Sequence, residues 1–252
     1  MESLLIAVDA APFADRVASW LPDLASAGVR RVTLFHAIEG VGSECVKELD
    51  DLRPRLDRLA VQLSAREVEA DISLKRGDRV RWLTSLAELR TNQVLVVGSR
   101  CTMTSAGRPV GSTLRRLLEA SRVPLLVIST TREASGPRLF DRPFLKSGGP
   151  YAAGIESRAR ALIPVPLSST ALDAEPGDGV PPEATLVVTG PDTSADAFGG
   201  LLDRCSCPVL AFPREHRALR RCGDRHKLTL YHCNASPPPP IRELFVCSWC
   251  HP

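Results

Sequence analysis

The sequence predicts an α/β fold in which helices cover both faces of a parallel β-sheet. Short apolar runs without polar interruption, such as Leu4–Val8 and Val94–Val97, are typical of strands that are buried on both faces. Between these runs lie segments whose apolar residues recur every three to four positions, as in amphipathic helices. Because strands alternate with helices, we expect right-handed crossovers and a doubly wound, five-stranded sheet over residues 1–131.

The strands of this first segment are expected where apolar residues run together, and helical stripes separate them. The expected strands are Leu4–Val8, Val32–Ile38, Asp71–Leu74, Val94–Val97 and Val123–Ser129.

Four helices are indicated between these strands. The first carries an apolar stripe from Phe13 to Leu24; we expect Pro22 to kink or end it and Gly28 to stop it. The second has a leucine stripe over residues 49–63. The turn at Gly77-Asp78 opens the third, and Ser112 is expected to cap the fourth.

A weaker echo of the same pattern follows a polar segment, 132–141, which we interpret as a linker. Leu186–Gly190 parallels the run that ends at Gly98, and Cys207–Phe212 parallels Val123–Ile128. We therefore predict a truncated, degenerate second copy over residues 138–214. Its elements are expected at Pro143–Lys146 (strand), Tyr151–Ala161 (helix), Leu162–Leu167 (strand), Leu186–Gly190 (strand), Asp196–Arg204 (helix) and Cys207–Phe212 (strand).

Residues 215–252 differ from both copies, since they are rich in Cys, His and Pro, and we expect a poorly ordered tail. The soft ligands Cys222, His226, Cys247 and Cys250 leave a zinc site as the lesser alternative, because their spacing matches no familiar ribbon.

Charge and composition exclude several classes of partner. The net charge of +3 implies no strong field for nucleic acid. The apolar runs are far shorter than the roughly 20 residues of a membrane span, so no membrane is expected. The amino-terminal residues lack the basic region and cleavage site of a signal peptide. We expect a cytoplasmic protein with reduced thiols.

Ligands of a doubly wound sheet bind at the carboxyl ends of its strands. Here Asp9 ends the first strand and Gly98 ends the fourth, while Gly111 precedes a helix. Such a helix start offers backbone N–H groups and a positive dipole end to a phosphate. The hydroxyls of Ser112 and Thr113 add donors, and Asp9 offers an acceptor to a ribose or a ligand to Mg²⁺.

In these residues the chain resembles the universal stress protein family, whose nucleotide-binding members carry Gly-x2-Gly-x9-Gly-Ser/Thr after the fourth strand. Gly98, Gly111 and Ser112 match this pattern, and Asp9 matches the family's first-strand aspartate. The resemblance implies an adenine nucleotide alpha hydrolase-like fold and ATP or AMP, with or without Mg²⁺, as ligand. The nucleotide-binding residues it implies are Asp9, Ala10, Ala37, Ile38, Gly98, Ser99, Arg100, Cys101, Gly111, Ser112 and Thr113.

One position departs from that pattern, because Cys101 stands where the family has its second glycine. A Cβ there obstructs close approach of the backbone to a phosphate. Two functions remain open: a nucleotide-binding stress-response regulator, and a nucleotide-free interaction module whose phosphate loop has decayed. No residue makes a convincing general base, and His36 lies inside an apolar run, so we expect no enzyme.

The resemblance also implies a partner for the fifth strand, since family members usually dimerise by antiparallel pairing of that strand. In a duplicated chain, Val123–Ile128 can pair with Pro208–Phe212 and cover both sheet edges. Pairing between two chains, as a homodimer, is the alternative.

Overall fold

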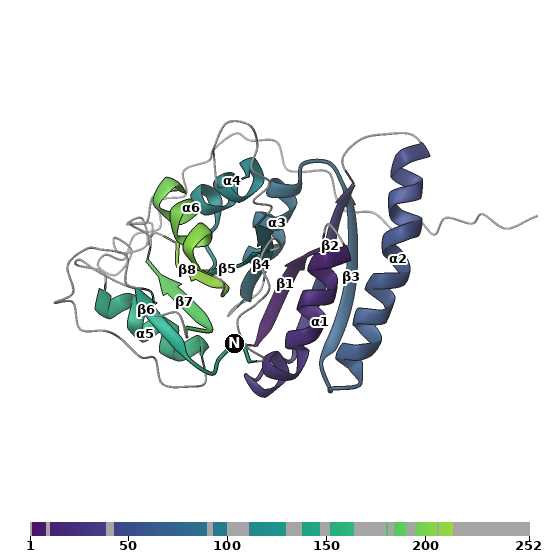
Figure 1. Cartoon of the computed structure of the whole chain (residues 1–252). Helices are drawn as coiled ribbons and strands as arrows, with labels where there is room; N and C mark the ends of the chain where they lie inside the picture. The colour runs from purple at the N-terminus through teal and green to yellow at the C-terminus, as the bar shows by residue number, and fades with distance from the viewer. Residues whose placement is uncertain are drawn as a thin grey trace, which may run out of the picture. The chain divides into compact units, whose positions relative to one another are not determined.

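The strands of the computed structural model form one eight-stranded sheet (Figure 1). They are β1 (Ser3–Ala7), β2 (Arg31–Ile38), β3 (Glu69–Arg76), β4 (Gln93–Ser99), β5 (Leu125–Ser129), β6 (Pro143–Lys146), β7 (Leu186–Thr189) and β8 (Val209–Ala211). Their order across the sheet is β3-β2-β1-β4-β5-β8-β7-β6. The structure describes residues 2–8, 11–38, 43–89, 93–99, 111–129, 138–146, 152–163, 180, 184–190, 195–205 and 207–213.

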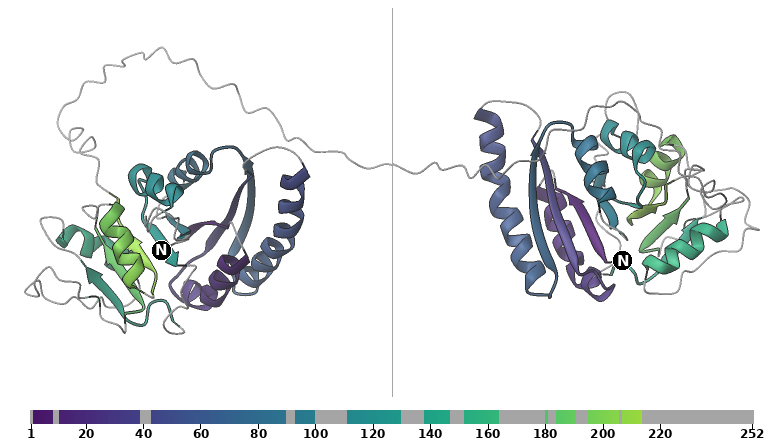
Figure 2. Two further views of the ribbon diagram at one scale, coloured as in Figure 1. Left: turned by 45° about the horizontal axis from the view of Figure 1, so that its top comes forward. Right: turned by 180° about the vertical axis from the view of Figure 1, so that it is seen from behind.

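Helices cover both faces of this sheet, as Figures 1 and 2 show. The helices are α1 (Ala11–Ser26), α2 (Ser43–Ser64), α3 (Arg79–Glu88), α4 (Ser112–Ala120), α5 (Ala152–Leu162) and α6 (Ala195–Arg204). Side chains of α1, α2 and α5 share one apolar cluster, and those of α3, α4 and α6 share another. Strand residues alternate between the two, since Leu4 and Ile6 belong to the first cluster and Leu5 to the second. The unbroken apolar strand runs follow from this double burial.

The first segment has the predicted strand–helix order. Of the two outcomes expected at Pro22, a kink or an end, the end does not occur, since helix α1 continues through Pro22 to Ser26. Gly28 follows with a φ of 82°, a left-handed conformation that suits glycine at a helix end. The Gly28 and Val29 N–H groups donate to the carbonyls of Ala25 and Leu24, which closes the helix.

The expected antiparallel pairing joins the two segments. Strand β5 pairs with β8 through Leu125 with Ala211, Leu126 with Leu210 and Val127 with Val209. The pairs β1–β2, β1–β4, β2–β3, β4–β5, β6–β7 and β7–β8 are parallel. The pairing gives β5 and β8 a neighbour on each side and leaves β3 and β6 outermost.

Two expectations for the second segment need correction. Leu162 is the last residue of helix α5, not the first of a strand, and residues 164–167 lie outside the described part of the chain. The expected linker is not polar throughout, because Leu139 and Phe140 are buried in the apolar cluster of α1 and α5. The Leu139 N–H also donates to the Asp23 carboxylate on α1.

Strands β6, β7 and β8 run in the order expected if they correspond to β1, β4 and β5. Internal duplication stays a prediction, since this order alone does not distinguish it from a separate addition to the sheet. Cys205 and Cys207 lie in the core of this segment, as expected for small apolar residues. A hydrogen bond with Cys205 and burial raise the pKa of the Cys207 thiol, so it stays protonated and unreactive.

Gly190, which follows β7, packs against Ile155 of α5. A Cβ built at Gly190 would lie 2.2 Å from the Ile155 Cδ1 atom. We therefore expect Gly190→Ala to lower the free energy of unfolding by about 1–3 kcal/mol. Chemical denaturation measures this loss. The substitution Ile155→Val removes the Cδ1 atom, so G190A should cost clearly less in that background; an equal cost in both backgrounds contradicts this packing.

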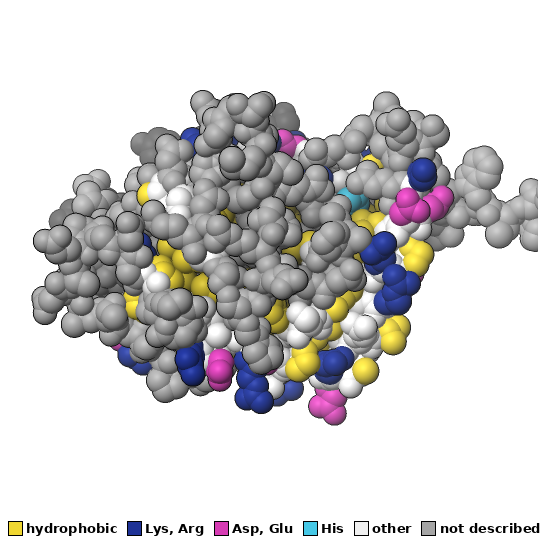
Figure 3. Space-filling model, viewed as in Figure 1, with side chains coloured by type: hydrophobic (Ala, Val, Ile, Leu, Met, Phe, Trp, Pro, Cys, Tyr) yellow, Lys and Arg dark blue, Asp and Glu magenta, His cyan; other side chains and the backbone are white. Residues whose placement is uncertain are grey.

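The compact unit that contains this sheet spans Met1–Glu215, and residues 214–252 lie outside the described part of the chain. The zinc candidates Cys222, His226, Cys247 and Cys250 lie outside the described residues. No group of metal-ligating side chains occurs among the residues that are described. Helices in the described part of the chain are too short or too polar to cross a membrane. On the face in Figure 3, side chains of both charge signs lie along the lower and right-hand rim.

Candidate functional site

The carboxyl end of β1 is held in place by β2. The Val8 N–H donates to the Phe35 carbonyl at 2.8 Å, and the His36 Nδ1–H donates to the Val8 carbonyl at 2.7 Å. His36 is only 1% exposed, so the hydrogen bond lies in the protein interior, where the low dielectric constant makes it stronger than in water. The backbone that leads into Asp9 is therefore fixed on both sides of Val8.

Helix α3 begins beside this strand end, after a sharp turn. Gly77 has a φ of 108°, which only glycine adopts readily, and Asp78 caps the helix by accepting from the Arg81 N–H at 2.9 Å. The other Asp78 oxygen accepts from Arg116 of α4 at 2.7 Å. One carboxylate thus links the amino end of α3 to the middle of α4.

The N-cap of helix α4 lies one residue earlier than predicted. Gly111, not Ser112, is the N-cap, with φ −61° and ψ 153° and no side-chain cap. The reason is that the Gly111 carbonyl already accepts the first helical bond, from the Arg115 N–H at 3.0 Å. Ser112 is therefore helical, and the first N–H groups of α4 carry no side-chain cap from residue 111.

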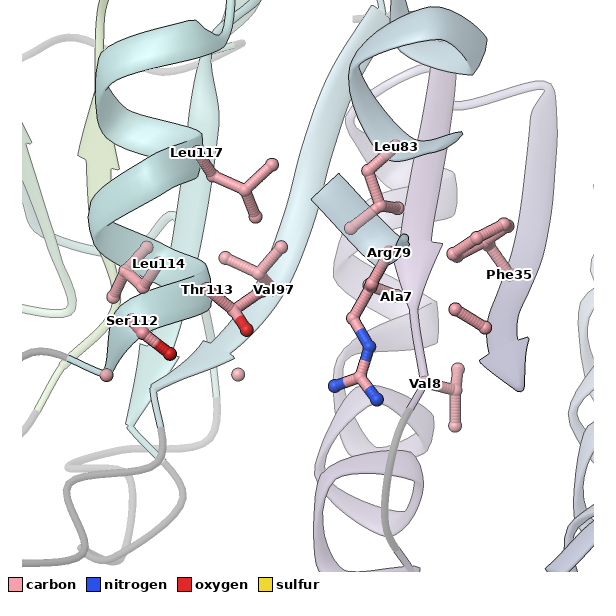
Figure 4. A pocket seen from close by; sticks show the side chains of 13 residues that line it. Ala7, Val8, Phe35, Arg79, Leu83, Val97, Ser112, Thr113, Leu114 and Leu117 are labelled. Carbon is pink, nitrogen blue, oxygen red and sulfur yellow. The ribbon is translucent and has the colours of Figure 1, made fainter. Parts of the chain in front are cut away.

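A pocket with a volume of about 290 Å³ opens where these three ends meet (Figure 4). It is walled by the carboxyl-terminal halves of β1, β2 and β4 and by the first two turns of α3 and α4. The residues lining it are Ala7, Val8, Phe35, Ala37, Arg79, Leu83, Val97, Gly98, Gly111, Ser112, Thr113, Leu114 and Leu117. Strands β1 and β4 are neighbours whose helices leave in opposite directions, which is the switch point of a doubly wound sheet.

The structure brings together a substantial part of the predicted site. The predicted residues that line the pocket are Ala37, Gly98, Gly111, Ser112 and Thr113. Ile38 is buried but is not among the lining residues, and Ser99 is the last residue of β4. Asp9, Ala10, Arg100 and Cys101 lie outside the described residues.

Sequence reasoning missed the rest of the lining. Leu83, Leu114 and Leu117 belong to the apolar cluster of α3, α4 and α6, and they also line the pocket. Arg79 was not singled out, although it follows directly on the Gly77-Asp78 turn. That turn was the available signal, because it starts a helix at the same sheet edge as Asp9 and Gly98.

Chemically, the pocket joins apolar and anion-binding elements. Phe35, Ala37 and Leu83 offer an apolar wall, while the first N–H groups of α4 and the hydroxyls of Ser112 and Thr113 offer donors. Among the described lining residues, Arg79 carries the charge, and this charge is positive. The described lining therefore suits a flat apolar group that carries an anion.

Asp78 links the two helices that form this pocket, and its ionisation is predicted to affect stability. The hydrogen bond from the Arg81 N–H and the ion pair with Arg116 lower the pKa of Asp78 below its ordinary value of 3.8. A lowered pKa gives stability that is fully present above the ordinary value and is lost as the pH falls through the folded-state value. Urea denaturation at a series of acidic pH values should therefore show a steeper loss for wild type than for Asp78→Asn, which keeps a cap. Equal slopes would contradict the link.

Comparison with known proteins identifies the family. The sequence profile of the universal stress protein family matches residues 1–129. The chain belongs to this family. The match covers the segment that contains β1–β5 and every lining residue of the pocket. No curated protein matches the chain.

Solved structures extend the likeness in fold beyond the matched segment. A universal stress protein from Archaeoglobus fulgidus is 16% identical, with a TM-score of 0.64 over 84% of this chain and 96% of that chain. A functionally unknown protein from Pseudomonas aeruginosa is 13% identical, with a TM-score of 0.55 over 84% of this chain and 92% of that one. Both likenesses reach past residue 129, so the eight-stranded arrangement is similar to folds found in single chains.

Proposed function

We propose that this universal stress protein is a stress-response regulator that binds an adenine nucleotide, AMP or ATP, in its first domain. The observation that carries the proposal is the pocket at the switch point between β1 and β4. There, an apolar wall for a base lies beside the amino end of α4, where Gly111 supplies no side-chain cap, and such a helix end suits a phosphate. Family membership supports the same assignment.

The arrangement of the lining residues suggests an orientation for the nucleotide. The base packs between Phe35, Ala37 and Leu83, and the phosphate accepts from the Gly111–Thr113 turn. The pocket volume of about 290 Å³ is at the lower end of ligand pockets, which span roughly 300–1,000 Å³. A mononucleotide therefore fits better than a dinucleotide.

Asp9 completes the proposed site from the sequence pattern. It follows Val8, whose N–H and carbonyl are both tied to β2. A carboxylate there accepts from a ribose hydroxyl or, with ATP, helps to hold Mg²⁺ on the phosphates. The residues of the Gly98–Ser112 motif that lie between these positions, Ser99, Arg100 and Cys101, are assigned to the phosphates on the family resemblance.

Binding without strong catalysis is part of the proposal. His36 lies in the sequence between the lining residues Phe35 and Ala37, and its Nδ1–H donates to the Val8 carbonyl. A buried imidazole with this structural task is a poor general base. We expect ATP hydrolysis to be slow or absent, and the protein to act through its bound and unbound states in the cytoplasm.

The experiment is a search for nucleotide on the purified protein, followed by thermal shift with AMP and with ATP plus Mg²⁺. We expect a rise in melting temperature that saturates with AMP or ATP, because ligands that bind only the folded state stabilise it. A protein that shows no shift at millimolar nucleotide and carries none after purification would instead be the nucleotide-free interaction module that Cys101 favours.

Cys101 offers a separate prediction, since it replaces the family's second glycine. A non-glycine residue in the left-handed region costs roughly 1–2 kcal/mol, and about 1.4 kcal/mol corresponds to a tenfold change in affinity. We expect Cys101→Gly to bind AMP about tenfold more tightly than wild type, as measured by isothermal titration calorimetry. Weaker binding in this variant would refute that interpretation of position 101.

We also propose that β6–β8 arose by duplication and that the β5–β8 pairing makes the chain an internal pseudo-dimer. A homodimer through the fifth strands of two chains is the alternative, and it requires β8 to give up its place beside β5. Sedimentation equilibrium distinguishes them: the first expects a monomer of 27.3 kDa, and the second a mass twice as large.

A further inference from the structure

Arg79 occupies an unusual place in the pocket. It is the first residue of α3, and its side chain extends past Ala7 toward Val8, across the pocket from Ser112 and Thr113 of α4 (Figure 4). It is half-buried, whereas Arg81 of the same helix is exposed. The guanidinium and the amino end of α4 thus lie on opposite walls of one pocket.

A cation at this position opposes the local electrostatics of the helix. The amino end of a helix is the positive end of its dipole, so a cation there is unfavourable. Positions that break a local rule in this way often serve a function rather than stability.

We propose that Arg79 is the residue that selects anionic nucleotides over uncharged nucleosides at this site. This proposal rests on the proposed function and assigns recognition of the negative charge of the ligand to one side chain. The guanidinium donates to phosphate oxygens that the α4 amino end binds from the opposite side. Charge-assisted hydrogen bonds from arginine to phosphate are about twice as strong as neutral ones and are often bidentate. Arg79 therefore recognises the phosphorylated form, while Phe35, Ala37 and Leu83 contact the base in either form.

The test compares AMP with adenosine by isothermal titration calorimetry on the full-length protein. In Arg79→Gln we expect AMP affinity to fall at least about tenfold and adenosine affinity to stay unchanged. Arg79→Lys should recover only part of the AMP affinity, because lysine keeps the positive charge but cannot donate two parallel hydrogen bonds as a guanidinium does. Arg81→Gln is the matched control, since it removes an exposed cation from the same helix turn and should leave both affinities unchanged.

Thermal denaturation without ligand separates selection from a structural role. A melting temperature of R79Q close to that of wild type would show that the pocket is intact, so that a selective loss of AMP affinity reports on binding. Equal AMP binding by R79Q and wild type would overturn the proposal, as would parallel losses of AMP and adenosine affinity. If wild-type protein binds neither compound, the proposed function itself is wrong and the role of Arg79 fails with it.

Discussion

Val209→Asp should lower the free energy of unfolding by about 3–5 kcal/mol, because it places an unpaired charge in the core. Val209 is 0% exposed and lies in β8 between two partner strands. It is opposite Val127 in the antiparallel pair with β5 and opposite Val187 in the parallel pair with β7. Urea denaturation followed by circular dichroism measures the loss.

The same substitution on the surface provides the control. Val61 of α2 is 69% exposed, so Val61→Asp should change the free energy of unfolding by no more than about 0.5 kcal/mol. A Val209→Asp protein that unfolds like the Val61→Asp protein would contradict the central position of β8. If the β5–β8 seam opens in Val209→Asp, the exposed edge of β5 should also drive self-association, which size-exclusion chromatography detects.

Gly111→Asp should abolish measurable AMP binding, or weaken it by far more than tenfold, while it stabilises the protein. Gly111 is exposed and has φ −61° and ψ 153°, a conformation that any residue adopts. An aspartate at this N-cap accepts from the first N–H groups of α4 and gains about 0.3–1 kcal/mol from the helix dipole. The same carboxylate then occupies the position proposed for the phosphate and repels it.

Gly111→Asn is the matched control, because asparagine caps a helix equally well and carries no charge. We expect it to weaken AMP binding much less than Gly111→Asp. Calorimetry gives the affinities and thermal denaturation gives the stabilities of the ligand-free proteins. Equal AMP affinity in the two variants would show that no anion binds at the amino end of α4.

The sequence predicted the sheet well because each strand buries both faces, which leaves an apolar run such as Leu4–Val8 with no polar interruption. It predicted helix ends less well. Pro22 lies inside α1 because packing against the sheet outweighs the local cost of proline, and Leu162 continues α5 although apolar runs of this length also suit strands. Periodicity alone does not resolve such short segments.

For the site, the sequence predicted the glycines and hydroxyls but not the cation. Gly98, Gly111 and Ser112 follow a motif with fixed spacing. Arg79 belongs to no such motif, and it lines the pocket because the turn at Gly77 starts α3 beside the ends of β1 and β4. Phe35 and Val97 were expected only as strand residues, because their place at the strand ends depends on the register of β1 with β2 and β4. Sites assembled from several strand ends therefore need the register as well as the motif.

The central claim is that an adenine nucleotide binds in the first domain, between β1 and β4. The most direct measurement is a titration of isotope-labelled protein with AMP, followed by NMR of the backbone amides. The account predicts saturable shifts of the Gly98, Gly111, Ser112 and Thr113 signals, with those of Thr189 and Gly190 unchanged. Signals at the α4 amino end that stay fixed at millimolar AMP, or shifts confined to the second segment, would contradict it.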